Sequence, residues 1–109
     1  MNTLKINGIT VSKRTKKADK FWTRFMGLMF KRQIDFDVLV LEPCNSIHTF
    51  FMRFNIDVLF LDENFKVIKK VENLKGSKII MPIKGAKYVA EGRASYFEDV
   101  NIDDIIELV

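Results

Sequence analysis

The segment "IDVLFLDENFKVIKKV", Ile56 to Val71, contains two apolar runs separated by a short polar turn. Both runs are rich in β-branched residues, which fit a pleated, partly buried surface. Asp62 and Asn64 between them favour turns, because their short polar side chains can hydrogen-bond to the neighbouring backbone. The segment therefore predicts that Asp57 to Asp62 is a central strand, paired antiparallel with Val67 to Val71.

Further strands are predicted on both sides of this hairpin. "LKINGITV" places apolar residues around Asn7-Gly8, a dipeptide that suits the positive φ angles of a two-residue turn, and predicts a second hairpin. "DVLVLEP" is typical of a buried strand that a proline ends. The later pieces "KIIMPIKGAKYVAEG" and "VNIDDIIELV" are cut by Pro82, Gly85 and Gly92 and leave no room for long crossover helices. Antiparallel pairing is therefore expected.

One helix is predicted near the N-terminus, within "SKRTKKADKFWTRFMGLMFK". Apolar residues recur there at steps of three and four, the period of a helix; they are Ala18, Phe21, Trp22, Phe25, Met26 and Met29. We expect this helix to lay an aromatic stripe on the sheet, and the alternative is a basic amphipathic helix on a membrane surface. The predicted fold class is α+β and mainly β: a compact antiparallel sheet or small barrel with one amphipathic helix near the N-terminus.

Length and composition predict a single domain over residues 1–109. The chain has 109 residues, of which 48% are hydrophobic, and a net charge of +4. It contains no apolar run of the roughly 18 to 20 residues that a membrane span needs, and its N-terminus has no signal-like apolar core, so a cytoplasmic location is expected. A lone cysteine cannot form an internal disulfide, and neither a cofactor nor a metal is expected.

The charges are unevenly distributed. Residues 1–32 contain nine Lys/Arg and the single acid Asp19, whereas residues 98–109 contain five acids and no base. A basic N-terminal third can bind nucleic acid or anionic lipid, but it can also be a solvated face, which is the interpretation we favour. Nucleic acid is accordingly a disfavoured partner.

Cys44 and His48 are the only cysteine and the only histidine, and they lie four residues apart. They could form a nucleophile and its base only if the chain bends, because four residues of extended strand span roughly 13 Å. The alternatives are a small buried cysteine and a hydrogen-bonded imidazole. Structural zinc needs four ligands and lacks the usual paired spacing here.

Arg53 and Asp57 follow closely in the same stretch. A turn at Asn55 could join them as a charge-assisted pair, either as an ion pair that fixes the strand junction or as a substrate contact. No phosphate loop, serine elbow, metalloprotease motif or dinucleotide fingerprint occurs. The candidates for binding a ligand or partner are His48, Arg53, Asp57, Cys44, Asn45 and Met52.

The stretch "LEPCNSIHTFFMRFNIDVLFLDENFKVIKKVENL" resembles a bacterial and archaeal family, domain of unknown function 192. The positions that match its central signature are Met52, Asp57 and Phe60, and Gly27-Leu28-Met29 resembles an upstream element. Its C-terminal pattern is matched loosely by Glu91-Gly92 and Asp103-Asp104. The resemblance implies a small, mainly β domain, often in exported proteins, without an established reaction.

The preferred functional hypothesis is a small soluble, non-enzymatic accessory module that binds a small ligand or a protein partner. A competing hypothesis is a small hydrolase or transferase that uses Cys44 and His48, with Arg53 steadying an anionic group and Asp57 orienting a partner side chain. A weaker one is a nucleic-acid accessory protein that uses the basic N-terminal third.

Overall fold

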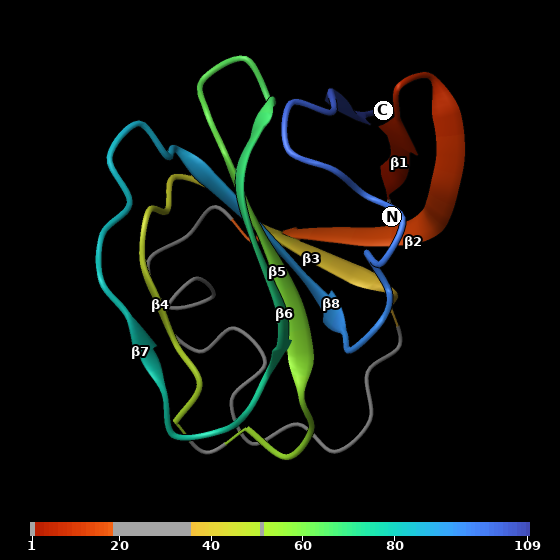
Figure 1. The fold of residues 1–109 in the computed structure, drawn as a ribbon. Coiled ribbons are helices and arrows are strands. Elements are labelled where there is room, and N and C mark those ends of the chain that lie inside the picture. Colours follow the sequence, from red (N-terminus) through yellow and green to blue (C-terminus); the bar gives the residue numbers. More distant parts are fainter. Residues whose placement is uncertain (1, 19–35, 51) are drawn as a thin grey trace.

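The computed structural model describes residues 2–18, 36–50 and 52–109 (Figure 1). Within these ranges the chain forms strands joined by turns, and no residue is helical. The strands are β1 (Asn2–Ile6), β2 (Ile9–Ala18), β3 (Val38–Leu41), β4 (Ile47–His48), β5 (Ile56–Leu61), β6 (Val67–Leu74), β7 (Ile79–Ile80), β8 (Tyr88–Arg93) and β9 (Ile106–Leu108).

Both predicted hairpins are confirmed. β1 and β2 pair antiparallel with Ile6 opposite Ile9, and Asn7 and Gly8 between them have φ angles of 51° and 83°. Positive φ at both turn positions gives a twist that matches the twist of the flanking strands. β5 and β6 also pair antiparallel, with Val58 opposite Val71. Local turn chemistry therefore determines these two hairpins.

Seven strands form one sheet in the order β6-β5-β8-β3-β2-β1-β9. The prediction of antiparallel pairing is wrong at one place, because β2 and β3 run parallel, with Thr15 opposite Val38. The other pairs in this sheet are antiparallel. The sheet is therefore mixed rather than purely antiparallel.

The sheet curls until its two edge strands approach each other (Figure 1). An isolated bridge joins Lys66, just before β6, to Ile105, just before β9. The amide of Val67 donates to the Asp104 carbonyl at 2.9 Å, and the amide of Ile106 donates to the Phe65 carbonyl at 2.9 Å. One end of the curled sheet is thus closed like a barrel.

The two faces of the sheet support two apolar clusters. The barrel-side cluster lies inside the curl and is built around Leu4, Ile6, Val38, Val40, Leu59, Leu61, Val67, Tyr88, Ala90, Phe97, Val100 and Ile106. The ribbon-side cluster lies on the opposite face and is built around Ala18, Phe36, Leu39, Leu41, Ile47, Ile56, Val58, Phe60 and Val89. β5 is buried along its whole length because it contributes alternate side chains to both clusters.

β4 and β7 form a separate two-stranded ribbon. Ile47 pairs with Ile80, and His48 pairs with Ile79. The side chains of Ile47 and Ile80 pack in the ribbon-side cluster. The ribbon therefore covers part of that face of the large sheet, and β7 lies at the margin of the molecule (Figure 1).

The prediction of an α+β class with an N-terminal helix is wrong. Residues 12–18, where the helical segment was expected to begin, belong to strand β2. The rest of that segment, residues 19–31, falls outside the described residues. β2 is a strand because the Asn7-Gly8 turn pairs it with β1 and because its second half also pairs with β3. Hydrogen bonding on both sides outweighs a weak local helical preference.

Candidate functional site

Cys44 lies in the loop that leads from β3 to the ribbon, and it is half-buried against the ribbon-side cluster. Its amide donates to the Lys87 carbonyl at 2.8 Å, and its thiol donates to the Ser46 carbonyl at 3.0 Å. His48 is on β4, where its Nδ1 accepts from the amide of Phe50 at 3.3 Å. These backbone contacts engage the thiol and the imidazole separately, and no hydrogen bond between the two side chains is present in the described structure.

The carboxylate of Asp57 is bound by the backbone of the protein, which indicates a structural role. Its side chain is fully buried, and its two carboxylate oxygens accept from the amide of Asn73 at 2.9 Å and the amide of Phe97 at 3.1 Å. Its β5 neighbours Leu59 and Leu61 belong to the barrel-side cluster, whereas Cys44 packs on the other face. Strand alternation therefore directs Asp57 and Cys44 to opposite faces of the sheet.

The other predicted residues lie in the segments directly before and after β4. Arg53 and Asn45 are exposed, and Met52 is half-buried against the ribbon-side cluster. The predicted ion pair between Arg53 and Asp57 does not form among the described residues, since the carboxylate is bound by backbone amides on the barrel side. The central stretch thus does not bring Cys44, His48, Arg53 and Asp57 into one pocket.

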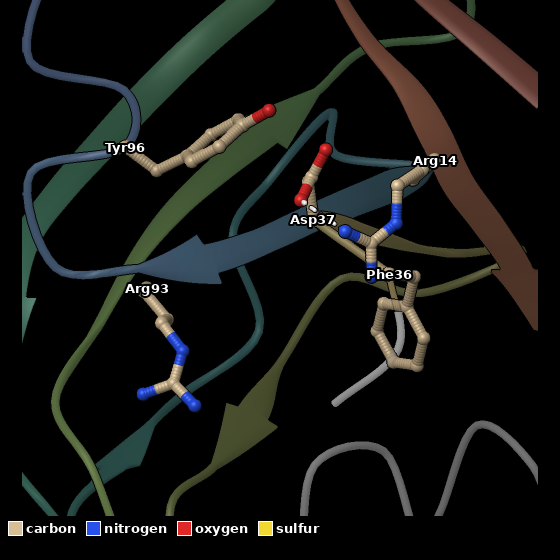
Figure 2. A pocket seen from close by; sticks show the side chains of 5 residues that line it. All are labelled: Arg14, Phe36, Asp37, Arg93 and Tyr96. Carbon is tan, nitrogen blue, oxygen red and sulfur yellow. Dashed lines mark ion pairs between the residues drawn. The ribbon is translucent and has the colours of Figure 1, made fainter. Parts of the chain in front are cut away.

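A pocket lies elsewhere, at one end of the large sheet, and the sequence alone gave no sign of it. It is lined by Arg14, Phe36, Asp37, Arg93 and Tyr96, and its volume is about 120 Å³. Figure 2 shows Arg14 and Arg93 on opposite sides of the pocket, with the guanidinium of Arg14 beside Asp37. The five residues come from three separate parts of the sequence, so no short motif could have revealed them.

The register of three strands places the charged groups. β2 and β3 run parallel in register from Thr15 opposite Val38, so Arg14 precedes this pair beside Asp37. The amide of Asp37 donates to the Arg14 carbonyl at 2.7 Å, and the two side chains form an ion pair of 3.8 Å. β8 adds Arg93 on the neighbouring strand, because Val38 pairs with Gly92.

The walls of the pocket hold these groups in place. The guanidinium of Arg93 lies 4.2 Å from the centre of the Phe54 ring, a cation–π contact that orients it. The hydroxyl of Tyr96 donates to the Val11 carbonyl at 3.1 Å. Burial raises the pKa of Tyr96 above its usual value, while a hydrogen bond with Ser12 opposes this shift. The phenol therefore remains neutral, and its ring is a fixed wall.

Gly92 and Asp57 together determine where Tyr96 lies. A Cβ at Gly92 would be 3.2 Å from the Cβ of Tyr96, a tight contact, so glycine at this position lets the turn after β8 fold back closely over the strand. The hydrogen bond from Phe97 to Asp57 then holds the turn. Asp57 is consequently a positioning residue for the pocket wall rather than a lining residue.

Glu91 is an unusual buried carboxylic acid two residues before Arg93. It is 4% exposed, and its β8 position faces the ribbon side, between Leu39 of β3 and Val58 of β5. Burial raises the pKa of Glu91 from 4.5 to about 7. Lys16 occupies the same row of the sheet, opposite Leu39, and Arg93 is two residues along β8 on the same face as Glu91. Glu91 therefore carries a proton through much of the acidic range.

Glu91 makes the stability of the protein pH-dependent. Because the folded state keeps a proton that the unfolded chain releases between pH 4.5 and about 7, stability is greatest below this window and falls as the pH rises through it. The loss is about 3 kcal/mol. The Glu91→Gln variant, which stays neutral, is expected to exceed the wild type by about this amount at pH 8 and to match it near pH 4.

Urea unfolding at a series of pH values measures this effect. Glu63→Gln is the matched control, since Glu63 is exposed. A Glu91→Gln variant with the same pH profile as the wild type and the control would show that Glu91 does not carry the proton.

Neither a metal nor a membrane-spanning site is found in the described ranges. No group of three or more His, Cys, Asp or Glu side chains there could hold a metal ion. The same ranges contain no helix with the length and apolarity that crossing a bilayer requires. The groups that the pocket offers to a ligand are the charged and aromatic side chains of its lining.

The curled mixed β-sheet defines a fold that two crystal structures share. A candidate transcription regulator from Sinorhizobium meliloti 1021 has a TM-score of 0.83 at 20% identity, covering 98% of this chain and 92% of that protein. A protein of unknown function from Novosphingobium aromaticivorans has a TM-score of 0.79 at 16% identity, covering 96% and 83%. At these identities the similarity concerns the fold alone.

The family model of DUF192, described as an uncharacterised ACR family, matches residues 2–107, and the chain belongs to this family. A relative named UPF0127 protein, from Thermococcus sibiricus, is 40% identical over 63 residues. The matched stretch spans 53% of this chain and 41% of that relative. The resemblance predicted from the central stretch is thereby confirmed.

Proposed function

We propose that the protein is a non-enzymatic binding module that takes a small anionic ligand, with a carboxylate or phosphate group, in the pocket between Arg14 and Arg93. The observation that supports this proposal is the presence of two guanidinium groups around one small space. Guanidinium groups donate in a planar fork that matches the oxygens of carboxylates and phosphates.

The charge balance of the pocket favours an anion. Arg14 and Arg93 contribute two positive charges, and Asp37 contributes one negative charge, so the lining carries a net charge of +1. Asp37 engages Arg14 only at 3.8 Å, and both side chains are partly exposed. A guanidinium has five N–H donors, so it can keep such a contact and still bind a ligand oxygen.

The size of the pocket limits the ligand to a small group. A volume of about 120 Å³ is small beside the roughly 300 to 1,000 Å³ of pockets that enclose a drug-sized ligand. Such a space accommodates a carboxylate or phosphate head, while the Phe36 ring offers an apolar contact for the atoms that follow. The rest of a larger ligand would extend into solvent.

A binding role accords better with the surroundings of Cys44 than a hydrolase role does. The thiol donates to the Ser46 carbonyl, and the Nδ1 lone pair of His48 is occupied by the amide of Phe50. A nucleophilic thiol needs a base within hydrogen-bond reach and donors for the developing oxyanion. A hydrolase based on Cys44 and His48 is therefore the less supported alternative.

Calorimetric titration with inorganic phosphate and with citrate, at low ionic strength, tests the proposal. Arg14→Gln and Arg93→Gln are each expected to weaken binding about tenfold, since each removes a charge-assisted hydrogen bond. Asp37→Asn is expected to strengthen binding, because it removes the negative charge from the lining.

Arg53→Gln is the matched control, because Arg53 is an exposed arginine outside the pocket. Equal weakening by Arg53→Gln would assign the effect to overall charge, and no heat of binding in the wild type for either anion would remove the proposal. Thermal unfolding of each variant confirms that the fold is retained.

A further inference from the structure

We propose that the outer face of the β4–β7 ribbon docks onto an anionic membrane surface. We call this face the ribbon patch, and it comprises His48, Phe50, Ile79 and Met81. It is separate from the anion pocket, so the two proposals can fail independently.

The pairing of the ribbon places these side chains together. His48 lies opposite Ile79, and the rings of His48 and Phe50 are 5.3 Å apart. Met81 follows directly after the end of β7, two residues beyond Ile79, and its side chain is exposed. The intervening residue, Ile80, packs inward in the ribbon-side cluster. The ribbon thus has an inner face in the core and an outer apolar face.

The outer face is strongly exposed. Ile79 is 60% exposed, Met81 is 71% exposed and Phe50 is 39% exposed. Single exposed apolar residues are common on proteins, but these three lie on β7 or within two residues of the ends of β4 and β7, so they are grouped at the ribbon. Such a patch marks a surface that a partner covers.

The residues around the ribbon patch are basic, which favours a partner with negative charge. Residues 43–56 and 73–90, which form the ribbon and its connections, carry Arg53, Lys75, Lys78, Lys84 and Lys87 and contain no Asp or Glu. All five basic residues are exposed. Residues 1–18 also contain no acid, whereas residues 98–109 contain five acids and no base, so the ribbon is one of the basic regions of an unevenly charged chain. Each Lys or Arg near an anionic bilayer increases affinity roughly fivefold.

The shape of the ribbon favours a lipid surface over a protein groove. β7 lies at the margin of the molecule, outside β4 (Figure 1). A protruding apolar edge inserts readily into the headgroup region, which deforms around it, whereas a protein partner must supply a complementary groove. β7 has only two residues and is followed closely by Pro82, so it is a poor template for adding a strand from another chain.

The test is co-sedimentation with vesicles of phosphatidylcholine alone and of phosphatidylcholine mixed with phosphatidylglycerol. We expect binding at least about tenfold stronger to the anionic vesicles, weakened by added salt. The double variant Ile79→Ser/Met81→Ser is expected to reduce binding at least about tenfold. The variant Lys75→Gln/Lys78→Gln/Lys84→Gln is expected to abolish the preference for anionic lipid.

Ile9→Ser is the matched control, because Ile9 is 70% exposed and lies on β2, away from the ribbon. It is expected to bind vesicles like the wild type. No binding of the wild type to anionic vesicles, or unchanged binding of the Ile79→Ser/Met81→Ser variant, would overturn the proposal.

A random single-stranded oligonucleotide is the second arm of the test. Oligonucleotide binding stronger than vesicle binding, lost in the lysine variant but kept in Ile79→Ser/Met81→Ser, would assign the surface to nucleic acid and overturn the membrane proposal. Arg93→Gln is expected to leave vesicle binding unchanged, which separates this surface from the anion pocket.

Discussion

Asp57→Ala is expected to lower the free energy of unfolding by about 3 to 5 kcal/mol. The fully buried carboxylate accepts from the amides of Asn73 and Phe97, and alanine would leave the buried Phe97 amide and the partly buried Asn73 amide without this acceptor. Each buried donor left unsatisfied costs about 1 to 3 kcal/mol. Because Phe97 adjoins Tyr96, the variant is also expected to weaken phosphate binding in the pocket.

Urea unfolding measures this loss. Asp57→Asn retains one acceptor oxygen and is expected to lose about half as much stability. Asp99→Ala is the control, since Asp99 is an exposed carboxylate in the turn that Asp57 holds. Equal unfolding midpoints for Asp57→Ala and the wild type would show that these two hydrogen bonds do not stabilise the fold.

Phe60→Ala is expected to destabilise the protein by a similar amount, about 3 to 5 kcal/mol. Phe60 is fully buried in the middle of β5 and packs in the ribbon-side cluster, between β6 and β8. Truncation removes the transfer free energy of the ring and leaves a cavity that rigid strands on both sides cannot close.

Two further substitutions serve as controls for the Phe60→Ala measurement. Phe60→Leu retains most of the volume and is expected to cost much less than alanine. Phe50→Ala removes the same ring from a site that is 39% exposed and is expected to change stability little. Phe60→Ala and Phe50→Ala with equal effects would contradict the position of Phe60 in the core.

The elements that sequence predicted correctly are those that neighbouring residues determine. Asn7-Gly8 requires positive φ at two positions, and this chemistry specifies a hairpin without reference to the rest of the chain. The hairpin from Ile56 to Leu74 follows from two apolar runs around a polar turn. The buried strand expected from "DVLVLEP" is found as β3 for the same reason.

The predicted N-terminal helix rested on apolar residues spaced three and four apart, of which only Ala18 lies in the described residues. Ala18 belongs to β2, where the buried residues Ser12, Thr15 and Ala18 recur every third residue, so this spacing is not unique to helices. The pairing of β1 with β2 is irregular at Leu4, which interrupts the usual two-residue alternation. The parallel pairing of β2 with β3 depends on the path of the chain between them, which local patterns do not encode.

The pocket could not be predicted from local sequence patterns either, because its residues are far apart in the sequence. Arg14 on β2, Asp37 directly before β3 and Arg93 on β8 become neighbours only through the order β8-β3-β2 in the sheet. The central stretch, by contrast, concentrates Cys44, His48, Arg53 and Asp57 in the sequence, but strand alternation sends Asp57 to the opposite face from Cys44. Proximity along the chain therefore suggested a site that the sheet geometry does not build.

The closure of the curled sheet affects how fast the chain can fold. The Asn7 side chain accepts from the amide of Ile105, 98 residues away, and Leu4 pairs with Leu108. Contacts of this range must overcome the entropy of closing a loop of nearly the whole chain before they add stability. β-rich domains with such distant pairings fold in milliseconds to seconds, far more slowly than helical bundles of similar size. The hairpins β1–β2 and β5–β6 can form early, whereas the β9 contacts complete the fold last.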